Sequence, residues 1–107
     1  MEVKQDQIVL GNPDPTLVSE IRKTRPYVIV SPIEMNDNWR NAVIAPMTST
    51  SRNYPTRVKV KHNSQEGWVV MYQLITIDKI WMVEKYGSLS EKEIRECKRI
   101  IQEPFVE

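Results

Sequence analysis

Two short polar stretches carry the side chains best suited to chemistry. Residues 19–26 read SEIRKTRP, so one carboxylate and three cations, the last of them Arg25, stand directly before an apolar run. Thr48 and Ser49 follow the next apolar run. A guanidinium offers two parallel donors to a phosphate, and a hydroxyl can donate to a further oxygen. These residue types therefore suit a ligand that contains a phosphate group.

Spacing alone leaves two interpretations of these stretches. The simpler one is a solvated charged turn and a loop of turn-forming residues. The other is a shared site, because Arg25 precedes one predicted strand and Thr48 follows the next. If those strands are antiparallel neighbours in a sheet, both residues reach the same end of it.

The remaining chemistry-bearing residues favour structural roles. One histidine and one cysteine are too few for a zinc site of the usual ligand count. We interpret His62 as a solvated residue at the shoulder of a hairpin, with a catalytic role as the alternative. Cys97 is interpreted as a packing residue on the apolar face of a helix. The three glycines lie far apart, so they form no glycine-rich phosphate loop.

Size and composition predict one ordinary globular domain, spanning residues 1–107. The chain is 40% hydrophobic and 27% charged, and its net charge of +1 provides no global field that would draw it to nucleic acid. A single cysteine excludes an internal disulfide and fits a reducing compartment. No apolar run approaches the roughly 20 residues that span a bilayer, and the charged start has no signal-peptide pattern. We therefore expect a cytoplasmic protein that does not enter a membrane.

Short strands are predicted to position the polar stretches. Apolar runs bounded by proline or glycine, together with apolar–polar alternation, indicate where they lie. The predicted strands are residues 7–11, 27–30, 42–45, 57–61, 68–72, 74–78 and 80–83. Residues 27–30 and 42–45 are typical of strands buried on both faces. Residues 57–61 alternate, which places valines on one side and cations on the other.

The final segment changes to helical spacing. Ser90 and Glu93 form a capping-box pattern, in which each side chain can accept from the other residue's backbone N–H. Apolar residues from Ile94 to Ile101 then recur on one face, and Pro104 is expected to end the helix. Several strands with one terminal helix predict a mainly β fold with a C-terminal helix, built as a small, strongly bent sheet or barrel.

An ordered series of short motifs resembles the MazF/PemK family of toxin endoribonucleases. The series is DPT at 14–16, SE at 19–20, RP at 25–26, VSP at 30–32, APMTS at 45–49, YP at 54–55, TIDK at 76–79 and GSLS at 87–90. The order of these motifs is specific, and the resemblance covers nearly the whole chain. For the two polar stretches, the resemblance favours a shared site over the simpler interpretation of solvated turns.

The resemblance implies a fold, an activity and partners. The implied fold is an SH3-like small barrel of the MazF/PemK/CcdB type with a C-terminal helix. The implied activity is that of a type II toxin–antitoxin toxin, an mRNA interferase that cleaves single-stranded RNA at short sequences without a metal or other cofactor. The implied partners are a second copy of the chain in a homodimer and a cognate antitoxin that covers the site.

The resemblance also implies which residues act. The family's active-site arginine and threonine match Arg25 and Thr48, and its loop glutamate matches Glu20. Attack by the substrate's own 2′-hydroxyl requires proton transfer and stabilisation of the phosphoryl oxygens. A guanidinium stays protonated far above neutral pH, so Arg25 is assigned charge stabilisation and proton donation, and Glu20 the base role or the orientation of Arg25. RNA contacts are assigned to Ser19, Lys23, Ser49, Tyr54, Arg57, Tyr72 and Gln73.

Departures from the family pattern motivate an alternative function. Residues 72–76 read YQLIT where many relatives carry an aspartate and an arginine, and Val18 occupies a position that is commonly glycine. The alternative is a diverged, inactive or CcdB-like protein that acts by contact with a protein such as DNA gyrase. For the RNA contacts, the alternatives are that Tyr54 packs and that Arg57 belongs to a solvated strand face.

Overall fold

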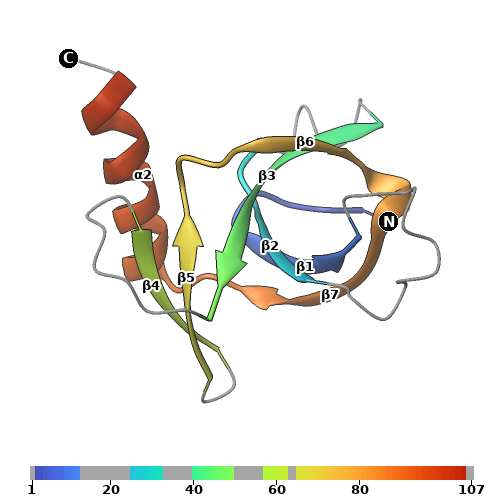
Figure 1. The fold of residues 1–107 in the computed structure, drawn as a ribbon, viewed down its shortest axis with the longest axis horizontal. Helices are drawn as coiled ribbons and strands as arrows, with labels where there is room; N and C mark the ends of the chain where they lie inside the picture. The colour runs from blue at the N-terminus through green and yellow to red at the C-terminus, as the bar shows by residue number, and fades with distance from the viewer. Residues whose placement is uncertain (1, 13–24, 33–39, 50–56, 63–64, 106–107) are drawn as a thin grey trace.

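The described residues form an antiparallel sheet that curls on itself, with a helix packed beside it (Figure 1). The computed structural model describes residues 2–12, 25–32, 40–49, 57–62 and 65–105, with side chains as far as residue 100. The elements are β1 (Gln7–Gly11), β2 (Arg25–Ile29), β3 (Asn41–Thr48), β4 (Arg57–His62), β5 (Gln65–Val70), β6 (Ile75–Asp78), a 3₁₀ helix (Lys79–Trp81), β7 (Met82–Ser88) and α2 (Glu91–Phe105). The prediction of a mainly β fold with a C-terminal helix is confirmed.

Strand β3 organises the sheet because it is long enough to pair with three neighbours. One edge of β3 pairs with β2. The other edge pairs with β6 through Asn41–Ile44 and with β5 through Met47 and Thr48. The main strand order is β4-β5-β3-β2-β1-β7, with β6 off this path. This change of partner along one edge separates the β4–β5 hairpin from the curled remainder of the sheet (Figure 1).

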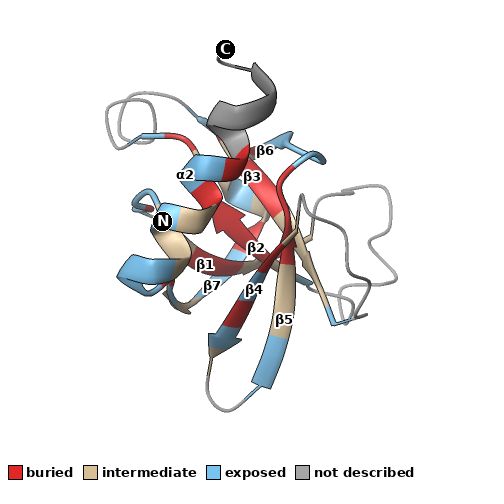
Figure 2. Cartoon of the chain, turned by 90° about the vertical axis from the view of Figure 1, so that its left-hand side faces the viewer, coloured by how far each residue is buried: buried red, intermediate tan, exposed pale blue. Residues whose placement is uncertain are grey.

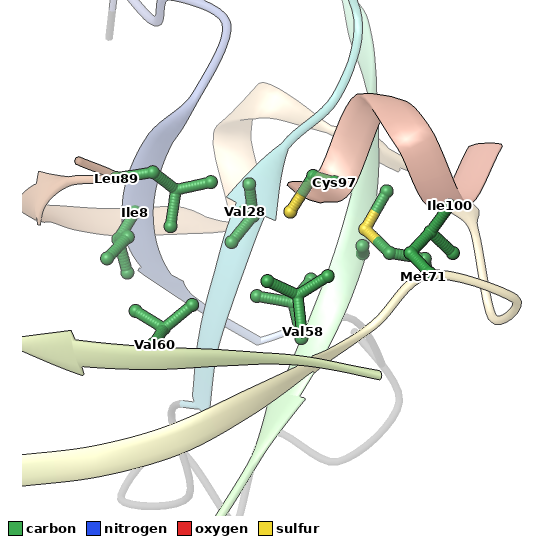
Figure 3. Close-up of a cluster of buried hydrophobic side chains, with 10 residues drawn as sticks. Ile8, Val28, Val58, Val60, Met71, Leu89, Cys97 and Ile100 are labelled. Carbon is green, nitrogen blue, oxygen red and sulfur yellow. The ribbon is translucent and has the colours of Figure 1, made fainter. Parts of the chain in front are cut away.

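Both faces of the central strands are buried, as the apolar runs predict. Successive side chains of a strand point to opposite faces, so on β2 Val28 packs into one cluster while Tyr27 and Ile29 pack into another. The first cluster joins the sheet, the hairpin and α2 (Figure 3). Each large apolar side chain that is fully buried contributes about 1.5–3 kcal/mol. The central strands are therefore a rigid platform, whereas the free end of the β4–β5 hairpin is exposed (Figure 2).

Helix α2 begins with the predicted capping box. The backbone N–H of Ser90 donates to Oε1 of Glu93 at 2.8 Å, and the backbone N–H of Glu93 donates to Oγ of Ser90 at 3.2 Å. The second carboxylate oxygen of Glu93 accepts from the backbone N–H of Lys61 at 2.9 Å, which ties the helix to β4. Cys97 and Ile100 are buried on the predicted apolar face. No helix in the described part of the chain is long and apolar enough to cross a membrane.

The region after β5 differs from the sequence prediction. The predicted strand at residues 80–83 is split, because Lys79–Trp81 form a 3₁₀ helix and β7 starts at Met82. Asp78 explains this break, since its Oδ1 accepts from the backbone N–H of Ile80 at 3.0 Å and so caps the helix. The alternation of apolar and polar residues cannot predict such a side-chain cap, so the 3₁₀ helix was missed.

Two further boundaries were predicted wrongly. The strand expected at residues 68–72 is β5, which starts at Gln65 and ends at Val70, because the register with β4 extends the pairing back to His62. Helix α2 ends at Phe105, one residue beyond Pro104. A proline in the last turn removes a single backbone donor, so it shortens the helix less than a proline in the interior.

Candidate active site

The register between β2 and β3 brings Arg25 and Thr48 to the same end of the sheet. Tyr27 pairs with Pro46 in this antiparallel ladder. Arg25 lies two residues before Tyr27, and Thr48 lies two residues after Pro46, both still within their strands. Continuing the register therefore sets Arg25 across from Thr48. The two strands are thus antiparallel neighbours, which is the condition for both residues to reach the same end of the sheet.

A cavity of about 570 Å³ opens at this end of the sheet. Its polar lining comes from β2, from the end of β3 and from the β4–β5 hairpin, and consists of Arg25, Thr48, Ser49, His62, Gln65 and Glu66. Its other lining residues are Ile8, Leu10, Pro26, Met47, Val60, Gly67 and Tyr86. The cavity thus combines an apolar wall with cationic, anionic, hydroxyl and amide groups, a mixture typical of ligand sites.

Arg25 contributes a positive charge to the lining of this cavity. Its side chain is exposed, whereas Thr48 is half-buried. Burial raises the pKa of the Tyr27 phenol, and the neighbouring charge of Arg25 lowers it in part, so the guanidinium lies near this side chain, which is not part of the cavity lining. A guanidinium beside a hydroxyl can bind a phosphate through several donors at once. Arg25, Thr48 and Ser49 are therefore the lining residues that suit a phosphate, whereas Glu66 brings a negative charge to the same cavity.

His62 lies in the cavity wall, contrary to its interpretation as a solvated surface residue. Its side chain is half-buried, and its Nε2 lies 2.7 Å from the carbonyl oxygen of Tyr86. The two rings are 4.9 Å apart and tilted by 55°. The sequence places His62 at a hairpin shoulder, but only the pairing of β7 with β1 brings Tyr86 next to it. One signal in the sequence could have indicated that His62 is half-buried. The alternation of residues 57–61 continues to position 62, which falls on the same side of the strand as Val58 and Val60.

Three residues with assigned RNA contacts lie away from the cavity. Arg57 pairs with Val70 at the opposite end of the hairpin from His62. Tyr72 and Gln73 follow that end of β5, with Tyr72 52% exposed and the backbone N–H of Gln73 donating to the carbonyl of Val70 at 3.2 Å. None of these three residues lines the cavity, and their assignment stays a prediction.

The other assigned residues fall into two groups. Ser49 lines the cavity beside Thr48. Ser19, Glu20, Lys23 and Tyr54 lie outside the described residues. Within the described residues, no group of three or more His, Cys, Asp and Glu side chains is placed to hold a metal ion.

The fold and the cavity together define a small, mainly β protein with a partly polar cavity at one end of its sheet. Residues 4–105 match the family of PemK-like, MazF-like toxins of type II toxin–antitoxin systems. Because the match spans nearly the whole chain, the protein belongs to this family. No curated protein matches the chain by sequence.

Solved structures share the fold at low sequence identity. The chain is similar to an endoribonuclease in complex with its cognate antitoxin from a mycobacterial species, with a TM-score of 0.80 and 18% identity over 94% of this chain and 91% of that one. It is similar to MazF from Deinococcus radiodurans, with a TM-score of 0.79 and 19% identity over 95% and 94% of the two chains. The Mycobacterium tuberculosis toxin MazF-mt6 gives a TM-score of 0.75 and 22% identity over 92% and 95%.

Proposed function

We propose that this chain is a toxin that acts as a metal-independent, sequence-specific endoribonuclease on single-stranded RNA. The observation that carries the proposal is the placement of Arg25 and Thr48 around one cavity at the end of the β2–β3 ladder. Membership of a toxin family and structural likeness to proteins named as endoribonucleases support it. Arg25, Thr48 and Glu20 are the proposed catalytic residues.

The proposed reaction uses the 2′-hydroxyl of the substrate as the nucleophile. The 2′-oxygen bonds to phosphorus, the bond to the 5′-oxygen breaks, and the products are a cyclic phosphate and a 5′-hydroxyl. Thr48 donates a hydrogen bond to a phosphoryl oxygen, and Arg25 stabilises the charge that develops there. Arg25 also protonates the leaving 5′-oxygen. Glu20 serves as the base or orients Arg25.

Substrate RNA is proposed to run from the cavity along the hairpin. Ser49 lies at the cavity, whereas Arg57 lies at the opposite end of the hairpin and Tyr72 and Gln73 follow that end. Exposed Tyr72 offers a face on which an unpaired base can stack, and this is how single-stranded RNA is commonly held. Ser19, Lys23 and Tyr54 complete the proposed set of contacts.

The proposed partners are a cognate antitoxin and a second copy of the chain. The structural likeness includes complexes with a cognate antitoxin, which supports the first of these. We expect the antitoxin to cover residues 22–25 and the protein to act in the cytoplasm. Sedimentation tests the homodimer, and a run with only monomer at micromolar concentration would contradict it.

The decisive experiment incubates the protein with a long mixed-sequence RNA in EDTA and maps the ends of the products. We expect cuts at one short sequence, with cyclic phosphate and 5′-hydroxyl ends, and no cuts by Arg25→Ala. A matched control is Arg99→Ala, because Arg99 is an exposed arginine on α2 outside the cavity. Intact RNA across varied substrates would overturn the proposal.

A second function has one observation in its favour. Tyr72, Leu74 and Ile75 are 52%, 39% and 40% exposed, and they lie in the segment that leads from β5 into β6. Such a segment suits contact with a protein, as in the CcdB-like alternative that binds DNA gyrase. Capture of gyrase by a chain that does not cleave RNA would favour this function, and RNA cleavage would remove it.

A further inference from the structure

His62 is the chain's single histidine, and its ring is held in place from two sides. The carbonyl of Tyr86 accepts from Nε2, and the Tyr86 ring lies against the imidazole. Gly87 provides the remaining space, because a Cβ at that position would lie 2.2 Å from Cε1 and 2.6 Å from Nε2 of His62. The imidazole is therefore oriented by β7 within the wall of the cavity that Arg25 and Thr48 also line.

The contact with Tyr86 determines which ring nitrogen carries the proton. A carbonyl oxygen only accepts, so Nε2 must donate and carries a hydrogen. In the neutral ring, Nδ1 is then left with a lone pair. Among the described residues, Nδ1 has no hydrogen-bond partner. When the ring is neutral, the geometry therefore leaves one nitrogen anchored and the other able to accept a proton.

We propose that His62 is the general base of the RNA cleavage, an inference that rests on the proposed function. Nδ1 takes the proton of the 2′-hydroxyl as the 2′-oxygen bonds to phosphorus. The bond between phosphorus and the 5′-oxygen breaks, and that oxygen keeps the electron pair and takes a proton from Arg25. Water then restores the proton of Arg25 and removes the one on His62. This assignment leaves Glu20 the role of orienting Arg25.

The choice of His62 over the other polar residues follows from acid–base chemistry. A catalytic base works best when its pKa is near the working pH, and imidazole is the side chain that ordinarily meets this condition. Arg25 is already protonated, and Thr48 is too weak a base. Glu66 lines the cavity but forms an ion pair with Lys59, with 3.5 Å between Oε1 and Nζ.

Several charged and titratable groups face the imidazole from the surrounding elements. Arg25 on β2 and Glu66 on β5 line the same cavity and carry opposite charges. Tyr86 on β7 contacts the ring directly. Glu93 on α2 accepts from the neighbouring Lys61. A pH profile of cleavage must therefore be compared between variants at position 62 and not interpreted from the wild type alone.

The single histidine makes its tautomer directly measurable by NMR. Labelling with ¹⁵N yields one pair of imidazole nitrogen signals without any assignment problem. We expect the neutral form to carry its hydrogen on Nε2, and we expect the Nδ1 signal to shift when an uncleavable 2′-O-methyl RNA of the mapped sequence is added. Hydrogen on Nδ1, or no shift on addition of that RNA at saturation, would overturn the proposal.

The kinetic test uses His62→Gln, whose amide can still donate to the Tyr86 carbonyl but cannot transfer a proton. We expect cleavage to fall about 100-fold or more. We also expect binding of the uncleavable RNA to stay within about threefold, and the loss of rate at low pH to disappear. Lys92→Gln is the matched control, because Lys92 is exposed on α2 and lies outside the cavity. Folding of each variant is checked by circular dichroism.

A substrate with sulfur in place of the bridging 5′-oxygen distinguishes a variant that lacks the general base from one that lacks the general acid. A thiolate leaves without being protonated, so this substrate would rescue a variant that lacks the acid, and we expect no rescue of His62→Gln. Rescue, an unchanged rate or a mere loss of RNA affinity would each overturn the inference while leaving the proposed function intact. No cleavage by the wild type would overturn both.

Discussion

The imidazole of His62 occupies the space that any side chain at position 87 would need. A Cβ built on Gly87 lies 2.2 Å from Cε1 and 3.0 Å from Nδ1 of His62, distances at which one residue must move. Gly87 belongs to β7 and pairs with Ile8 of β1, so its backbone is held within the sheet. The histidine, on the hairpin, is therefore the partner that yields.

The first prediction concerns this contact. Gly87→Ala should displace His62 from Tyr86, lower stability by about 1–3 kcal/mol through overpacking and slow RNA cleavage. Adding His62→Ala to Gly87→Ala removes the clash, so the double variant should be more stable than the sum of the two single changes predicts. Urea denaturation of the four proteins measures the coupling. Additive free energies of unfolding would show that the two residues do not compete for space.

The second prediction concerns the pair at the cavity. Thr48→Val keeps the shape of the side chain and removes its hydroxyl, so cleavage should fall about 100- to 1,000-fold while affinity for uncleavable RNA changes little. Arg25→Lys should also lose most activity, because an ammonium keeps the charge but not the two-pronged fork. Single-turnover cleavage assays measure both effects. Arg99→Lys on α2 is the control, and a Thr48→Val variant with full activity would contradict the assignment.

The third prediction concerns the buried thiol. Burial raises the pKa of Cys97 from its ordinary value of 9.0 to about 12, with smaller contributions from the charges of Asp6, Glu93 and Glu96. Little thiolate forms in the folded protein at pH 8, so a disulfide reagent should react with Cys97 only after unfolding. Fast labelling of the native protein would contradict this expectation.

The same shift has a consequence for stability. Because the folded pKa of Cys97 lies above the unfolded one, the folded state holds its proton more tightly. The stability that results is fully present below pH 9 and is lost as the pH rises towards 12. Urea denaturation of the wild type and of Cys97→Ala between pH 8 and pH 11 measures this difference. A parallel pH dependence of the two proteins would show that Cys97 is not responsible.

The fourth prediction concerns the start of α2. Ser90→Ala removes one capping hydrogen bond and should cost about 1 kcal/mol. Glu93→Ala should cost more, because its carboxylate accepts from the backbone N–H groups of both Ser90 and Lys61. Thermal or urea denaturation ranks the two variants. Equal losses would mean that the link from the helix to β4 contributes nothing.

Local patterns in the sequence predicted most of the elements of this fold. The alternation of Val58 and Val60 with cations gave β4 the observed burial, and the spacing of Ser90 and Glu93 gave α2 its cap. The patterns did not predict structure that depends on a single side-chain cap or on a segment without apolar–polar alternation. Asp78 ended β6 by capping a 3₁₀ helix, and Val3 became fully buried although no strand pattern surrounds it.

The candidate site was predictable only in part. The sequence by itself determined that Arg25 and Thr48 stand at the ends of two apolar strands, since residue type and local period depend on neighbours along the chain. Only the tertiary structure decided that these strands pair in a register that sets the two residues across from one another, and that His62 joins them. Strand pairing and the fit of His62 against Gly87 depend on contacts between residues far apart in the sequence, and local spacing carries no record of such partners.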